Sequence, residues 1–206
     1  MPDLNRRLLI AAGAAGFALP AAAAPGVAAP GDMSLGNAAA PVKVVEYASL
    51  TCPHCAHFHA TVFPTLKSKY IDTGRVHFTL KEFLTQPEQV AAAGFLVARC
   101  AGPSRYFSVV DGIFKSQSQW QAGNIKPILV GVAKANGLTE AQFDACLEDQ
   151  KQLDALQGRM QRAVEVDKIN ATPSVFVNGK PVGGDHVPDL AELEAAIAAA
   201  QRTGRR

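Results

Sequence analysis

The sequence predicts an α/β fold built from a β-α-β unit and a β-β-α unit, with a run of helices between them. Residues 42–48 (VKVVEYA) are β-branched and apolar enough to form a buried strand that leads directly into a helix. Near the other end, residues 174–177 (SVFV) followed by Asn178-Gly179 are typical of a strand and a tight hairpin turn. No strand-like alternation occurs over residues 86–168. A helical segment therefore separates the two strand-containing units.

Residues 1–23 have the layout of a secretory signal peptide. A basic start at Arg6 and Arg7 precedes a small-residue apolar run, which closes with an Ala-x-Ala site ending at Ala23. We expect an ordinary export signal cleaved near Ala23 and a flexible Ala/Pro/Gly-rich leader over residues 24–40. A twin-arginine signal and a retained anchor helix are the alternatives. Cleavage removes two arginines and one aspartate, so the formal net charge falls from +2 to +1, which gives no reason to expect nucleic acid as a partner.

The β-α-β unit comes first. The strand over residues 42–48 is followed by the motif CPHC at residues 52–55, and Pro53 suits the first turn of a helix because its missing N–H is not needed there. Apolar residues continue at helical spacing, with a kink expected at Pro64. Residues 75–83 (RVHFTLKEF) then alternate like a second strand.

The rest of the chain supplies the helical segment and the β-β-α unit. One of its helical stretches starts with a capping-box signal at Thr139, and residues 188–202 are typical of a last amphipathic helix. This order of elements is that of a thioredoxin fold. The thioredoxin-like domain is predicted over residues 41–85 and 169–206, and the inserted helical domain over residues 86–168.

Cys52 and Cys55 form a Cys-x-x-Cys pair at the start of the first helix. This spacing lets the two sulfurs close a small disulfide, and the helix N-terminus points its dipole and free N–H groups at the first sulfur. Cys52 is therefore predicted to be the reactive thiolate. Cys55, one turn inside and better shielded, is predicted to be the resolving thiol. His54, between them, is expected to stabilise the Cys52 thiolate by charge or by a hydrogen bond when it is suitably oriented.

A structural zinc site is the alternative for this motif. Cys52, Cys55 and His59 fall on one helical stripe, with His57 nearby. The remaining histidines do not have the spacing of a second ligand pair. The sequence therefore favours redox chemistry without a bound metal, and His57 and His59 are expected to be partly exposed on the helix.

A second signal is the Thr172-Pro173 pair just before the late strand. X-Pro bonds are the usual site of cis peptides, and a cis bond here would turn the Thr172 backbone outward to pair with an extended substrate. An ordinary trans turn is the alternative.

The segments EYASLTCPHCAHFH and INATPSVFVNGKPVGG resemble the DsbA family of periplasmic disulfide oxidoreductases, and the likeness spans nearly the whole mature chain. The resemblance implies that Cys52 attacks, Cys55 resolves, His54 tunes the pair, and Thr172-Pro173 faces them as a cis-proline loop. The sequence departs from the enterobacterial prototype because Thr172 replaces a valine. This change leaves the redox potential and the choice of partner proteins open.

Glu46 and Lys81 match family positions where buried charges lie below the active site. In this interpretation the two residues form a proton relay, in which Glu46 passes protons to or from Cys55 through water. A plain salt bridge between the two strands is the alternative.

Cys100 and Cys146 lie in apolar helical contexts of the insertion, FLVARCAG and FDACLED. In an oxidising compartment they are predicted to form a structural disulfide. Two buried free thiols are the alternative.

The resemblance further implies a monomeric periplasmic oxidase that needs no cofactor. Its partners would be reduced or unfolded exported proteins and, for reoxidation, a membrane quinone reductase of the DsbB type. A periplasmic reductase or isomerase is the alternative with the same chemistry. A metal-binding module that uses Cys52, Cys55 and His59 is the alternative of another class.

Overall fold

The structure, a computed structural model, describes residues 25–203 without the side chains of residues 121 and 122. The signal peptide predicted over residues 1–23 lies outside the described residues. Among the helices of the described part, none is long and apolar enough to cross a membrane.

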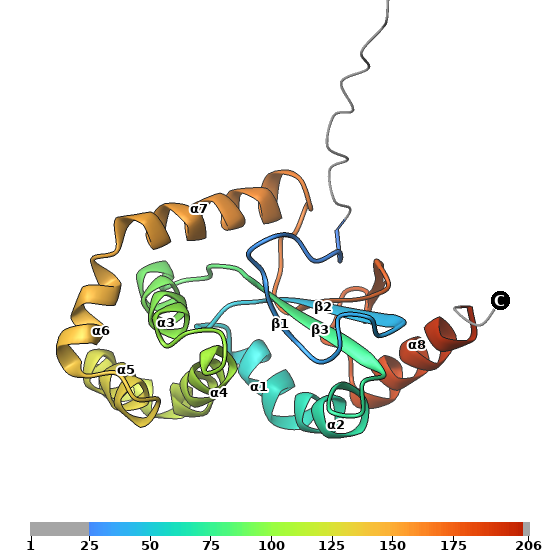
Figure 1. Cartoon of the computed structure of the whole chain (residues 1–206), viewed down its shortest axis with the longest axis horizontal. Coiled ribbons are helices and arrows are strands. Elements are labelled where there is room, and N and C mark those ends of the chain that lie inside the picture. Colours follow the sequence, from blue (N-terminus) through green and yellow to red (C-terminus); the bar gives the residue numbers. More distant parts are fainter. Residues whose placement is uncertain (1–24, 204–206) are drawn as a thin grey trace, which may run out of the picture.

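A five-stranded mixed sheet forms the centre of the molecule (Figure 1). Its strands lie in the order β1-β3-β2-β4-β5, in which β2 pairs with β3 in parallel and the other neighbours are antiparallel. The strands are β1 (Met33–Leu35), β2 (Val42–Ala48), β3 (Val76–Glu82), β4 (Ser174–Val177) and β5 (Lys180–Val182). The element order confirms the predicted fold: a β-α-β unit, helices and a β-β-α unit.

Both faces of β2 are covered, which explains why its sequence is a nearly continuous apolar run. Val44 belongs to a large core shared with α1 (Pro53–Thr61) and α8 (Leu190–Thr203). Tyr47 belongs to a smaller cluster under α7 (Gln150–Glu165). Figure 1 shows α7 passing over one side of the sheet, with α1 and α8 on the other.

The prediction of a flexible leader over residues 24–40 is wrong for its second half. Here β1 adds an antiparallel edge strand to β3, and the Ser34 and Thr79 hydroxyls hydrogen-bond at 2.8 Å. A three-residue edge strand contains too little alternation to be recognised in a sequence.

The helix that follows the CPHC motif is broken near Pro64, as expected. α1 ends at Thr61, and α2 (Phe63–Leu66) leads into a π-helical segment, η1 (Lys67–Ile71). Proline lacks a backbone N–H and its ring crowds the carbonyl one turn earlier, so a regular helix cannot pass through this point.

The chain between β3 and α7 is helical, in agreement with the prediction for this segment. Its elements are α3 (Glu88–Cys100), α4 (Tyr106–Ser116), the 3-10 segment η2 (Gln117–Ala122), α5 (Ile125–Ala135) and α6 (Glu140–Leu147). The predicted capping box starts α6, where the Thr139 side chain accepts from the Gln142 N–H at 3.2 Å. A disulfide joins Cys100 to Cys146, with the two Cα atoms 6.0 Å apart.

The hairpin between β4 and β5 turns at Asn178 and Gly179, which have φ angles of 46° and 76°. Positive φ at both positions is what a type I′ turn requires. The Asn178 side chain also accepts a hydrogen bond from the Lys43 N–H at 2.7 Å. This contact fixes one end of β4 against β2, so the other end of β4 is held beside the CPHC motif.

Candidate active site

Cys52 caps the N-terminus of α1. Pro53 occupies the first helical position, and the Cys52 sulfur accepts a hydrogen bond from the Cys55 backbone N–H at 3.4 Å. Cys52 is 6% exposed, whereas Cys55 is fully buried. An attacking sulfur atom from solvent can therefore reach Cys52 but not Cys55.

The loop before β4 lies directly against Cys52. The Thr172–Pro173 peptide bond is cis. In its thiol form, Cys52 Sγ donates to the Thr172 carbonyl oxygen at 3.3 Å. The fold thus brings together the two motifs that the sequence analysis singled out, although they are far apart along the chain.

The pKa of Cys52 is lowered from 9.0 to about 5. The largest cause is the Cys55 thiol, which hydrogen-bonds to the Cys52 sulfur; burial opposes it. Thr172 and the backbone N–H groups of Cys55 and His54 lower the pKa further. The Thr172 hydroxyl is buried and has no hydrogen-bond partner among the described residues. Cys52 therefore carries a stabilised thiolate near neutral pH.

Cys55 has the opposite environment. Burial raises the pKa of its thiol well above 9.0, and the charges of Cys52 and Glu46 raise it further. Two thiols in contact thus have strongly different proton affinities. This difference agrees with the prediction that Cys52 attacks and Cys55 resolves.

Glu46 does not lie beside Lys81, so the alternative of a plain salt bridge between the two strands is wrong. In the parallel register Glu46 is opposite Leu80, and Tyr47 is opposite Lys81. Successive side chains of a strand point to opposite faces, so Glu46 and Lys81 are on different sides of the sheet. Glu46 instead contacts His59, with 2.9 Å between its Oε2 and the imidazole Nε2.

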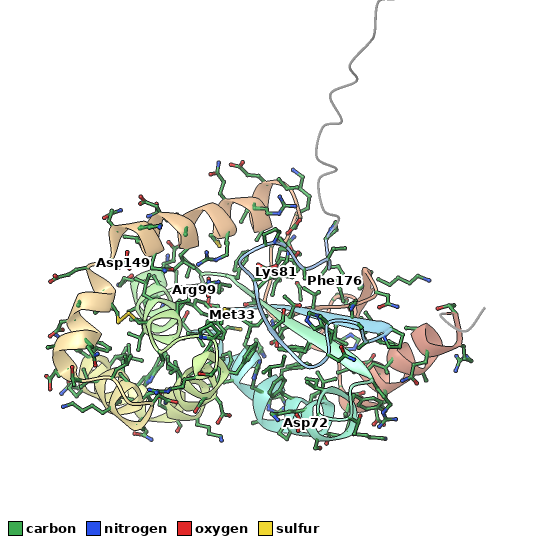
Figure 2. The ribbon with its side chains drawn as sticks, viewed as in Figure 1. Met33, Asp72, Lys81, Arg99, Asp149 and Phe176 are labelled. Atoms are coloured by element: carbon green, nitrogen blue, oxygen red, sulfur yellow. A yellow bond between two sulfur atoms is a disulfide. The ribbon has the colours of Figure 1, made fainter. Side chains whose placement is uncertain are left out.

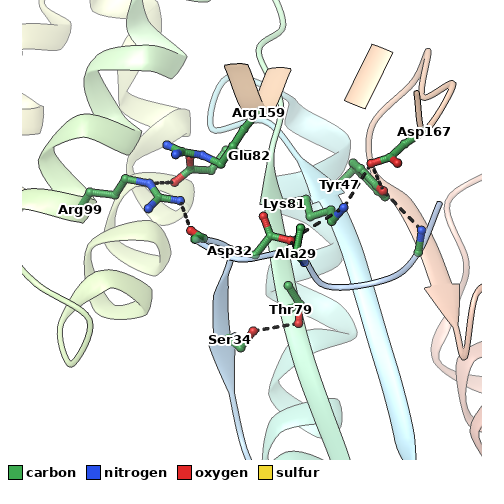
Figure 3. A network of polar contacts seen from close by, with 12 residues as sticks. Ala29, Asp32, Ser34, Tyr47, Thr79, Lys81, Glu82, Arg99, Arg159 and Asp167 are labelled. Carbon is green, nitrogen blue, oxygen red and sulfur yellow. Dashed lines mark hydrogen bonds and ion pairs between the residues drawn. The ribbon is translucent and has the colours of Figure 1, made fainter. Parts of the chain in front are cut away.

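Lys81 belongs to a buried polar network on the α7 side of the sheet (Figure 2). Its ammonium group lies 3.1 Å from Asp167 Oδ2, which also accepts a hydrogen bond from the Tyr47 hydroxyl at 2.8 Å. Figure 3 shows Tyr47, Lys81 and Asp167 converging, with Asp32 on the other side of Lys81 at 3.8 Å. Asp167 lies a few residues before the cis-proline loop, so this network anchors the loop that faces Cys52.

The histidines of the motif region divide into two kinds. His54 and His57 are exposed on α1, whereas His59 is buried, which corrects the expectation of partial exposure for His59. His54 lines a cavity of about 700 Å³ together with the cis-proline loop and the segment after β5. The contribution of His54 to the Cys52 pKa comes from its backbone N–H, and tuning by its imidazole ring stays a prediction.

Within residues 25–203 no group of three or more His, Cys, Asp and Glu side chains is placed to hold a metal ion. His59, one of the ligands of the alternative zinc site, is occupied by its contact with Glu46. The Glu46–His59 pair was not predicted from the sequence. The available signal was the spacing of Cys55 and His59, which are four residues apart and share one helix face.

Known proteins resemble the chain over most of its length. A family model described as thioredoxin matches residues 28–199. The crystal structure of Wolbachia pipientis alpha-DsbA1 has a TM-score of 0.77 and 27% sequence identity, and the match covers 87% of this chain and 95% of that one. The chain belongs to the DsbA family of thioredoxin-like proteins. A crystal structure of oxidised BdbD from Bacillus subtilis has the same fold, with a TM-score of 0.74, 22% identity and coverage of 83% and 93%.

Curated relatives of this DsbA-family chain are named for disulfide chemistry. One from Rickettsia bellii, named as a protein-disulfide oxidoreductase, is 38% identical over 150 residues, which are 72% of this chain and 57% of that protein. Disulfide bond formation protein D of Bacillus subtilis is 25% identical over 173 residues, 81% of this chain and 76% of that protein. The chain thus spans little more than half the length of the Rickettsia relative.

Proposed function

We propose that the chain is an exported thiol-disulfide oxidase that gives its Cys52–Cys55 disulfide to newly translocated proteins. The observation that carries the proposal is the environment of Cys52, whose thiolate is stabilised near neutral pH. A couple with a stabilised reduced form gives its disulfide away readily. The names of the relatives agree with this chemistry.

The reaction proceeds by two sulfur exchanges. A substrate thiolate attacks Cys52 Sγ, the Cys52–Cys55 bond breaks, and a mixed disulfide between Cys52 and the substrate forms. A second substrate thiolate then attacks the substrate sulfur of this mixed disulfide, and Cys52 leaves as a thiolate. The low pKa of Cys52 makes it a good leaving group in this second exchange.

The cis-proline loop is the proposed substrate-binding element. Thr172 lies next to Cys52, and the neighbouring cavity has room for an extended segment of a substrate. Backbone pairing with such a loop is tolerant of side chains. Tolerance of this kind suits an enzyme that acts on many unfolded proteins.

Glu46 is the proposed proton carrier for Cys55. When the substrate attacks, Cys55 leaves as a thiolate inside the protein, where burial and the nearby charges disfavour that form. A proton supplied through Glu46 makes Cys55 a better leaving group. The same carboxylate removes the proton when the disulfide is formed again.

Reoxidation requires a partner that accepts the two electrons of the dithiol, for which we propose a membrane quinone reductase of the DsbB type. Export to the periplasm is proposed from the signal-peptide pattern of residues 1–23. The Cys100–Cys146 disulfide suits an oxidising compartment, and we propose that it is structural. The protein is proposed to act as a monomer.

The oxidase activity is tested by mixing the purified, oxidised protein with a reduced, unfolded protein substrate in equimolar amounts. We expect the substrate to lose its thiols within minutes while Cys52 and Cys55 become alkylatable, and a Cys52→Ser variant to do neither. If the substrate keeps its thiols and the protein instead reduces or reshuffles disulfides in an oxidised substrate, a reductase or isomerase is the function.

A further inference from the structure

A second, larger cavity lies on the side of α1 away from the cis-proline loop. It has a volume of about 920 Å³ and is bounded by α1, α2 and α4. Most of its lining is apolar, but His59 is part of it. Asp111 and Lys115, whose side chains are 47% and 74% exposed, line its mouth. The cavity therefore connects the buried imidazole of His59 to solvent.

His59 is held in one place by its neighbours. Its ring lies between those of Phe63 and Phe114, with ring-centre distances of 4.6 and 4.4 Å. Its side chain is 3% exposed, and its Nε2 is 2.9 Å from Glu46 Oε2. The second carboxylate oxygen, Glu46 Oε1, is buried and has no hydrogen-bond partner among the described residues. Glu46 Oε1 is therefore free to exchange a proton with a neighbouring group.

The buried Cys55 needs a path for its proton that does not use the substrate side. In the mixed disulfide, the bound substrate lies over Cys52, which is 6% exposed, whereas Cys55 is fully buried. Cys55 and His59 are one helical turn apart on the same face of α1, and Glu46 on β2 contacts that face. A proton path therefore runs from the resolving thiol to solvent on the opposite side of α1, by way of Glu46, His59 and the cavity.

We propose that His59 is a positioning and relay residue, which holds Glu46 in place and carries the Cys55 proton between Glu46 and solvent in the cavity beside α4. The inference rests on the proposed exchange chemistry. It adds to that chemistry a further residue, His59, and a path for the proton to solvent that Cys52, Cys55 and Glu46 alone do not provide.

Reoxidation of the dithiol by a partner disulfide begins at Cys52. Cys52 has attacked one sulfur of the partner and released the other as a thiolate. The Cys55 S–H proton passes to Glu46 and then to His59 Nε2, and the proton on Nδ1 leaves to water in the cavity. The Cys55 sulfur attacks Cys52 Sγ, the bond between Cys52 and the partner breaks, and the partner leaves as its second thiolate. Substrate oxidation uses the same proton path in reverse.

Lys67, Asp111 and Lys115 also line the cavity, and each of them belongs to an ion pair. Lys67 lies 2.7 Å from Asp72, and Lys115 lies 2.7 Å from Asp111. His57 is exposed on α1 and lines the same cavity, but Glu46 contacts His59 and not His57. His57 is therefore the matched control for His59.

The test follows the reaction of the reduced, full-length protein with oxidised glutathione by rapid mixing, acid quenching and mass measurement of the mixed disulfide. We expect H59Q, whose side-chain amide can still hydrogen-bond to Glu46 but cannot relay a proton, to resolve the mixed disulfide about tenfold to a hundredfold more slowly. The H57Q variant should resolve it at the rate of the unchanged protein. Alkylation of Cys52 by iodoacetamide should be equal in all three proteins, because the attack by Cys52 does not use the relay.

Chemical rescue separates a relay from a purely structural role. In H59A the cavity extends to Glu46, so added imidazole should restore resolution with a rate that follows the concentration of neutral imidazole. Wild-type resolution rates in H59Q with an unchanged pH profile would overturn the proposal, as would slow resolution in H59A that imidazole does not improve. The glutathione reaction reports on Cys55 even if the protein proves to be a reductase, so a failure of the oxidase proposal is distinguishable from a failure of this one.

Discussion

Reduction of the Cys52–Cys55 disulfide is predicted to make the stability of the protein depend on pH in a defined way. The perturbation is the removal of one small disulfide while the Cys100–Cys146 bridge is kept. The pKa of the Cys52 thiol is about 5 in the folded protein, whereas that of an ordinary cysteine thiol is 9.0. Because the folded pKa is depressed, the stabilisation is fully present above about pH 9 and is lost as the pH falls through about 5.

The magnitude follows from the two pH units between 5 and 7. At about 1.4 kcal/mol per unit, the thiolate stabilises the reduced fold by about 2.7 kcal/mol at pH 7, and by about 2 kcal/mol once solvent screening at the mouth of the site is allowed for. The disulfide opposes this effect by stabilising the oxidised form. On the chain-entropy model, closing a four-residue ring restricts the unfolded chain and so contributes about 2 kcal/mol. The reduced form should therefore become more stable to unfolding than the oxidised form near pH 7. It should be the less stable form by about 2 kcal/mol at pH 4 and the more stable form by a similar amount at pH 8.5.

The assay is a set of paired urea melts of the oxidised and reduced protein at pH 4, 7 and 8.5. A reduced Cys52→Ser variant is the control, and its stability relative to the oxidised protein should lack this dependence. A stability difference that stays constant with pH, or that shifts toward the oxidised form as the pH rises, would refute the assignment of the stabilised thiolate to Cys52.

Three further predictions concern the cysteines and the network behind the sheet. At pH 6 Cys52 should be the one thiol of the reduced protein that iodoacetamide labels quickly, and Cys55→Ala should accumulate mixed disulfides because no thiol resolves them; equal labelling of both cysteines would contradict this. Replacing Cys100 and Cys146 by serine should lower the free energy of unfolding by about 4 kcal/mol, since the bridge closes a 46-residue loop, and an unchanged urea midpoint would count against a structural role. Lys81→Met should destabilise the fold by about 3 kcal/mol, because it leaves the buried carboxylates of Asp32 and Asp167 without their cation. The pH profile of Cys52 labelling should stay unchanged in this variant. A shifted profile would show that Lys81 influences the active site.

The parts of the fold with strong local patterns were predictable from the sequence. The apolar run of β2, the proline at the first helical position and the turn at Asn178-Gly179 each select one local conformation, and together they give the order of the elements. The edge strand β1 was not predictable, because three residues contain no measurable period. Its position depends on the exposed edge of β3, which exists only after the sheet has formed.

The candidate site was predictable where the chemistry is local and not where it depends on register. Cys52 and Cys55 are separated by one helical turn, so their relation follows from the motif itself. The alternative of a salt bridge between Glu46 and Lys81 is wrong, because a shift of one residue in a strand moves a side chain to the other face of the sheet. The burial of His59 could not be anticipated either, because the ring of Phe114 that covers it comes from α4 in the helical segment.

The reduction potential of the Cys52–Cys55 couple, measured by equilibration with glutathione buffers, tests the central claim most directly. A stabilised Cys52 thiolate makes the dithiol the preferred state of the folded protein. We therefore predict a potential at least as oxidising as about −180 mV, the value for protein disulfide isomerase. A potential near that of thioredoxin, about −270 mV, would contradict the oxidase proposal and identify the protein as a reductase.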